Sequence, residues 1–230
     1  MGGARPLWRN GRAMGGEGGQ AMVEAAFVLP LTVALILCTI QITQLQQARV
    51  LVEYAAFNAA RAGIVQNGNA GSDGATGPMH DAAALSLLPA HGRTDGFGAL
   101  AQTWATFRAH EAALRALGLR IVQVTVLNPR RGDFHRFGQH LGGQEIDFDD
   151  VRPEAVDVSL LSIRVRYLAE LRVPLANKLI HSLWLARRLR SGDHVGALAL
   201  AGRQGRYFVP VEAFQTMRMQ SNPFLRWAAP

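Results

Sequence analysis

Residues 19–40 read GQAMVEAAFVLPLTVALILCTI, an almost wholly apolar run of membrane length. A helix over residues 21–40 would be about 30 Å long at ~1.5 Å per residue, the thickness of a bilayer's hydrocarbon core. Glu24 is the one charged residue between Gly19 and Ala48. A charged side chain costs roughly 2.5–3.5 kcal/mol at the bilayer centre and less near its surface, so an intramembrane carboxylate indicates a function. We therefore predict a transmembrane helix in which Glu24 has a partner.

The segment before this run is predicted to be a disordered basic leader over residues 1–19. It is rich in glycine, lacks apolar periodicity and carries Arg5, Arg9 and Arg12. Arginines beside an apolar run favour a cytoplasmic amino terminus, which places the remainder of the chain outside. A cleaved secretory signal is the alternative, but the run is long for one and no small-residue cleavage site is obvious after Ile40.

The helix is predicted to continue past the membrane as a stem, so that residues 20–64 form one unit. Apolar and small residues recur there at three- and four-residue spacing: Ile42, Leu45, Val52, Ala56, Ala59 and Gly63. Small residues allow a helix or a sheet to approach closely. This stripe therefore predicts either packing on the chain's own domain or helix–helix assembly between subunits. Membrane helices tolerate proline, and we expect Pro30 to kink the helix near residues 26–30.

The order of these features resembles the amino-terminal signature of type IV pilins and pilin-like proteins. A glycine, Gly19, is followed by Gln20, by Glu24 as the fifth residue after that glycine, and by an apolar helix. The continuation resembles the TadE-like proteins of tight-adherence (Flp-type) pilus assembly. The matching stretches are Val23-Glu24, Phe27-Val28-Leu29-Pro30 and Ala59-Ala60-Arg61-Ala62-Gly63. Ala25 and Glu17 differ from the family, which commonly has an aromatic residue and a basic residue at these two places.

The resemblance implies a minor pilin-like subunit that is not an enzyme and lies in the bacterial inner membrane. A prepilin peptidase would cut between Gly19 and Gln20, and Glu24 would set the register between stacked subunits. The implied partners are the membrane, the prepilin peptidase, the pilus assembly platform, the major pilin and other pilin-like subunits. The alternative is an unprocessed single-pass membrane protein with an extracytoplasmic binding or scaffold domain, in which Glu24 reaches back to the cytoplasmic surface.

Residues 65–230 are predicted to form an extracytoplasmic α+β domain with a small antiparallel sheet and packed helices. Periodicity predicts helices over 80–88, 97–117 and 174–190, strands over 121–127 and 156–173 with a bulge or turn at Leu160-Leu161, and a last strand over 195–200. The helix over 174–190 is amphipathic and basic. It fits either packing on the sheet or an interfacial membrane helix with Trp184 at the boundary. Phe214, Phe224 and Trp227 of the tail either fold back on the domain or bind a partner.

The sequence carries no catalytic motif, and we expect no enzymatic activity, cofactor or metal. The net charge of +7 comes with no nucleic-acid-binding motif, so nucleic acid is not an expected partner. Cys38 is the only cysteine, which precludes an internal disulfide. The charged stretch over 130–153 is predicted to be a solvated loop. It holds the tripeptide Arg131-Gly132-Asp133, which we attribute to chance, and the possible metal ligands His135, His140, Asp147, Asp149 and Asp150, which lack zinc or calcium spacing.

Overall fold

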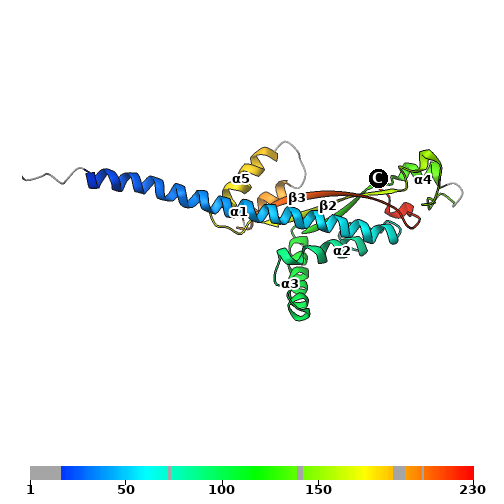
Figure 1. The fold of residues 1–230 in the computed structure, drawn as a ribbon, viewed down its shortest axis with the longest axis horizontal. Helices are drawn as coiled ribbons and strands as arrows, with labels where there is room; N and C mark the ends of the chain where they lie inside the picture. Colours follow the sequence, from blue (N-terminus) through cyan, green and yellow to red (C-terminus); the bar gives the residue numbers. More distant parts are fainter. Residues whose placement is uncertain (1–16, 72–73, 139–141, 189–194, 204) are drawn as a thin grey trace, which may run out of the picture.

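A computed structural model describes residues 17–71, 74–138, 142–188, 195–203 and 205–230. Its main feature is one helix, α1 (Glu17–Val65), of 49 residues. At ~1.5 Å per residue this helix is about 73 Å long. Its first part projects alone, and its second part lies along a folded domain built from the rest of the described chain (Figure 1).

The domain is built on a three-stranded antiparallel sheet in the order β1-β2-β3. The strands are β1 (Val122–Asn128), β2 (Leu160–Glu170) and β3 (Phe208–Arg218). β2 is central, pairing through Val165 with Val124 on one side and with Ala213 on the other. Inward residues of β2 alternate with half-exposed ones over most of the strand, as expected when a helix covers one face. α1 provides that cover along β2 and β3.

The remaining helices lie around α1 and the sheet. α2 (Pro78–Leu87) packs along α1 and leads through a short turn, η1 (Leu88–Ala90), to α3 (Phe97–Arg115), which projects away from α1 (Figure 1). α5 (Ala176–Arg188) and α6 (Val195–Arg203) lie near the place where α1 enters the domain, and α4 (Arg131–Phe137) lies at the opposite end. Two further short turns are η3 (Pro153–Ala155) and η4 (Leu225–Trp227).

The predicted α+β class is confirmed, with a long apolar helix followed by a small antiparallel sheet and several helices. The helices predicted over 80–88, 97–117 and 174–190 and the strand predicted over 121–127 appear with boundary shifts of a few residues, and residues 189–190 lie outside the described residues. The strand predicted over 156–173 is confirmed for its middle part alone. β2 starts at Leu160 without a break at Leu160-Leu161, because Val156 and Val158 belong to a turn after η3.

Two predictions were wrong. Residues 195–200 are part of helix α6, not a strand; Ala and Leu are strong helix formers, and a short apolar run does not separate the two states by period. The stretch 130–153 is not a plain loop, because it contains α4, whose Phe134 and Phe137 enter a small second core with Ile146, Ala155 and Val158.

The strand β3 was not anticipated. Pro210 lies inside it, and a proline argues against a strand when only the sequence is known. The structure resolves this because β3 is an edge strand, where a missing backbone N–H donor can face solvent.

Candidate functional site

The apolar span of α1 stands free of the domain. Every residue from 19 to 40 is exposed or half-exposed, and the most apolar window of the helix, with a mean hydropathy of 2.3, is only 6% buried. A core helix of a soluble protein would be mostly buried. The exposed part, residues 19–40, is about 33 Å long at ~1.5 Å per residue, which matches a bilayer's hydrocarbon core. The chain therefore fits a single-pass membrane protein.

The hydroxyl groups of this segment are satisfied within the helix itself. Thr32 and Thr39 donate to the carbonyl oxygens of Val28 and Leu35, at 2.8 and 2.9 Å. Such bonds suit an environment that offers no water as a partner. α1 continues through Pro30, which has no N–H to donate to the carbonyl four residues earlier. The kink expected at Pro30 stays a prediction.

Glu24 is the exception in this apolar surface. Its carboxylate is exposed, and none of the described residues forms a hydrogen bond or ion pair with it. It lies about 8 Å along the helix axis from Gly19, at ~1.5 Å per residue. Gly19 and Gln20 are exposed in the first turn of α1, and a Cβ added at Gly19 would meet nothing within 4 Å. Among the described residues, these three therefore lie exposed near the start of α1.

The junction between span and domain is marked by Gln41, the first buried residue of α1. Its side chain is 1% exposed, and its Oε1 accepts a hydrogen bond from the Val173 N–H at 2.9 Å. A cleft of about 260 Å³ opens beside it, lined in part by Gln44, Glu170 and Arg172. Polar walls of this kind belong in water, so a hydrocarbon region around the exposed span would end close to Gln41. Sequence reasoning passed over Gln41, although it is the first polar residue after the run.

The stem residues that resemble the TadE-like pattern lie in the domain core. Ala59 and Ala60 are fully buried, and a Cβ added at Gly63 would lie 2.6 Å from Cδ2 of Leu161 in β2 and 2.9 Å from Sδ of Met79 in α2. Arg61 points away from this contact and is exposed. The small residues thus let α2 and the sheet approach α1. The sequence predicted that this stripe packs either on the chain's own domain or on helices of other subunits. In the structure, it packs on the chain's own domain.

A buried histidine–glutamate pair joins α2 to α3. The Nε2 of His80 lies 3.1 Å from Oε1 of Glu111, and Nδ1 of His80 lies 3.3 Å from Oδ1 of Asp81. Burial acts to raise the pKa of Glu111, but the hydrogen bond from His80 and the positive charges of His80, Arg115 and Arg108 outweigh it and hold that pKa below its usual value. No sequence spacing pairs residues 31 positions apart, so sequence reasoning missed the pair.

A second histidine, His91, lies among aromatic rings between η1, α3 and β2. Its ring stacks edge-to-face with Phe107 and Tyr167, and the Tyr167 hydroxyl lies 3.2 Å from its Nε2. Burial, with help from the nearby charges of Arg172 and His110, lowers the pKa of His91 to about 4. The ring is therefore neutral at pH 7 and serves as a packing and hydrogen-bonding residue.

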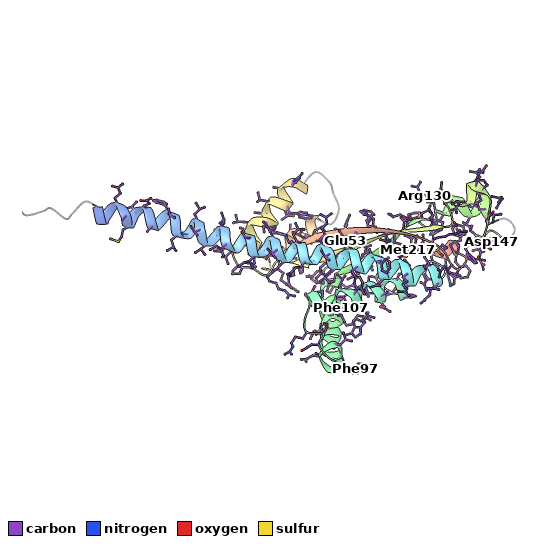
Figure 2. All side chains as sticks on the ribbon, in the orientation of Figure 1. Glu53, Phe97, Phe107, Arg130, Asp147 and Met217 are labelled. Carbon is purple, nitrogen blue, oxygen red and sulfur yellow. The ribbon has the colours of Figure 1, made fainter. Side chains whose placement is uncertain are left out.

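The 130–153 region lies far from the apolar span, at the end where Figure 2 labels Arg130 and Asp147. Among the described residues, no three His, Cys, Asp or Glu side chains come together as metal ligands. His140 lies outside the described residues. Asp133 of the Arg-Gly-Asp tripeptide accepts a hydrogen bond from the Arg130 N–H at 2.8 Å, so it caps the start of α4.

Comparison with known proteins places the family resemblance on this same helix. A family model described as TadE-like protein matches residues 19–61, which lie wholly within α1 and comprise the exposed span and most of the buried stem. No curated protein and no solved structure matches the chain. The resemblance drawn from the sequence is therefore confirmed for these residues, and residues 19–61 are a TadE-like segment.

Proposed function

We propose that the protein is a non-catalytic, minor pilin-like subunit, anchored in the membrane, for assembly of a tight-adherence or type IV-like pilus or secretion apparatus. The observation that carries this proposal is the exposed apolar span with Glu24 as its one charge, inside the TadE-like match. The same helix then becomes the core of a folded domain. This arrangement supports an anchor whose membrane part is free to contact neighbouring subunits.

Glu24 and Gln20 supply the proposed contact. After cleavage between Gly19 and Gln20, the new amino group of Gln20 pairs with Glu24 of a neighbouring subunit. Each charge would be costly alone in lipid, and pairing offsets both costs. Four residues of helix separate the two groups, so the pair sets an axial offset of about 6 Å between neighbours at ~1.5 Å per residue.

The stem has a second face for such contacts. Its small-residue face is occupied by β2 and α2, but Val50, Tyr54 and Phe57 are exposed at three- and four-residue spacing on the other side. This face continues the span beyond the membrane. A neighbouring pilin-like helix that pairs at Glu24 would run along it.

The amino terminus is assigned to the cytoplasm and the folded domain to the outside. The arginines of the leader support this direction. The peptidase, the assembly platform, the major pilin and sister pilin-like subunits are the proposed partners, and the bacterial inner membrane is the proposed location.

The first test is the amino terminus of the chain isolated from its own membranes, read by mass spectrometry. We expect a chain that starts at Gln20. Gly19→Leu is the informative variant, because nothing lies near a Cβ at Gly19 and the fold should not change. An uncut wild-type chain would contradict processing and favour the unprocessed single-pass protein with a binding or scaffold domain.

The second test is Glu24→Leu. We expect membrane insertion to be kept or improved, because a carboxylate leaves the lipid, while pili and subunit complexes are lost. Crosslinking between neighbouring subunits and surface pili are the measurements. Unchanged complexes and pili would refute the pairing role of Glu24.

A further inference from the structure

We propose that α5, together with Leu175 just before it, lies on the outer surface of the membrane that α1 spans, with a leucine face in the headgroup and acyl boundary of anionic lipids. This inference rests on the proposed membrane-spanning role of residues 19–40. It adds a second lipid contact, made by the folded domain.

The position of α5 follows from the junction. Gln41 is the first residue of α1 after the exposed span, and its side chain bonds to the backbone of Val173, two residues before Leu175. α5 contacts α1 directly. Figure 1 shows it beside α1 where that helix enters the domain. The start of α5 is therefore at the level where the hydrocarbon region ends.

The face that α5 turns outward is apolar. Leu179 and Leu183 are 50% and 68% exposed, and their spacing of four places them on one side of the helix. Leu175, which precedes the helix, is 60% exposed. The other side is fixed to the domain. His181 is buried there, and its Nδ1 lies 3.0 Å from the Phe208 carbonyl oxygen. The leucine face cannot turn inward without breaking this contact.

If α5 is an interfacial membrane helix, the sequence predicts Trp184 at the membrane boundary. In the structure, Trp184 faces the domain instead. It is half-buried and packs against the main core. The leucines, not the tryptophan, are therefore the lipid-facing residues of this helix.

The backbone at Leu175 supports a role for its exposed side chain. Its φ of 66° lies in the left-handed region, which is unfavourable for a residue with a Cβ and is usually occupied by glycine. Residues held in such a conformation cluster at functional positions, and here the residue carries a large, exposed apolar side chain that needs a contact away from water. A lipid boundary supplies that contact at this level of α1.

The charges on α5 select the kind of lipid. Lys178 and Arg187 are exposed on its flanks, Arg172 is exposed just before it, and the helix contains no acidic residue. An apolar face between basic flanks is the pattern of an interfacial helix on an anionic leaflet. A second copy of the chain would bring a surface of the same positive charge against this one, which disfavours a self-contact.

The test uses the full chain in vesicles of phosphatidylcholine and phosphatidylglycerol, with one cysteine at a time carrying a fluorophore. Native Cys38 reports the span. In a Cys38→Ala background, Leu179→Cys reports the leucine face, and Leu85→Cys, an exposed leucine on α2, is the matched control. Spin-labelled lipids quench a probe in lipid, and iodide quenches a probe in water.

We expect lipid quenching at Cys38 and at position 179 several-fold above that at position 85, with iodide quenching in the reverse order. Replacing phosphatidylglycerol by phosphatidylcholine should reduce lipid quenching at 179 but not at 38. If iodide quenches the probe at position 179 as strongly as the probe at position 85, the proposal is overturned. Protection of position 179 from both quenchers also overturns it, because the leucine face would then be covered by a protein partner. Loss of lipid quenching at Cys38 itself would instead refute the membrane-spanning role of α1.

Discussion

Gly63 lies where α1 packs so closely on β2 and α2 that a side chain would not fit without movement of its neighbours. It lies on α1, two residues before the helix ends. A Cβ there would lie 2.6 Å from Cδ2 of Leu161 and 2.9 Å from both Cε and Sδ of Met79. Leu161 and Met79 are both fully buried. Gly63→Ala therefore forces a close contact into a packed core.

The expected effect is the balance of two terms. Replacing glycine by alanine inside a helix is favourable by about 1 kcal/mol. Overpacking a core typically costs about 1–3 kcal/mol, because side chains must leave their preferred rotamers. The atoms that clash are the ends of flexible side chains, so the cost should not exceed this range. We expect Gly63→Ala to lower the free energy of unfolding by about 0–2 kcal/mol.

Gly98→Ala provides the matched control. Gly98 also lies in a helix, α3, but nothing lies within 4 Å of a Cβ added there. The same substitution should be neutral or stabilising by about 0.5–1 kcal/mol at this position. The two variants should thus differ by about 1–3 kcal/mol, the overpacking cost alone.

The assay is a urea titration of the full chain in detergent micelles, followed by tryptophan fluorescence. Met79→Ala should relieve part of the crowding, so Gly63→Ala should be less costly in that background than in the wild type. If Gly63→Ala is as stable as Gly98→Ala, the tight approach of α1 to α2 and β2 does not exist. The small residues of the TadE-like segment would then not be needed to let α2 and the sheet approach α1.

Three further predictions concern polar groups of the domain. Gln41→Leu should leave the Val173 N–H buried without its acceptor and cost about 1–3 kcal/mol in the same titration, whereas Gln41→Glu keeps an acceptor. His91 has a pKa of about 4 in the native state against 6.5 in the unfolded state. Its contribution to the free energy of unfolding is therefore complete above pH 6.5 and falls by about 3 kcal/mol as the pH drops to 4. His91→Gln should flatten this part of the stability–pH curve. Glu111→Gln should cost about 1–3 kcal/mol at pH 7 and less in acid. The lowered pKa of Glu111 gives stability that is present above its ordinary value near 4.5 and is lost as the pH falls further, so an equal cost at both pH values would contradict a stabilising role for the ionised carboxylate.

The sequence predicted the long apolar helix α1 because its signals are local. A run of apolar residues needs no knowledge of distant contacts to be read as a span, and the alternation of Val122, Val124 and Val126 is enough to predict β1. The strand β3 was missed because it depends on tertiary context. Pro210 is acceptable in β3 only because that strand is at the sheet edge, which the sequence does not reveal.

The candidate site divides in the same way. Glu24 is visible in the sequence because a charge in an apolar run is unusual. The bond from Gln41 to Val173 joins residues 132 positions apart, and Gly63 approaches Leu161, which follows it by 98 positions. Neither contact has a local signal, so the junction and the packing of the stem required the structure.

The packing of the stem also narrows where neighbouring subunits would meet. If the buried Ala59, Ala60 and Gly63 formed the seam between subunits, assembly would have to displace α2 and β2 from α1 and expose the main core of the domain. Burying apolar surface is the dominant stabilising term in a fold, so this exchange is unfavourable. Under the proposed function, contacts between the α1 helices of neighbouring subunits would therefore use the span with Glu24 and the exposed stem face with Val50, Tyr54 and Phe57. Substitutions in these two groups should weaken assembly while leaving the urea titration of the domain unchanged, and substitutions at Gly63 should do the reverse.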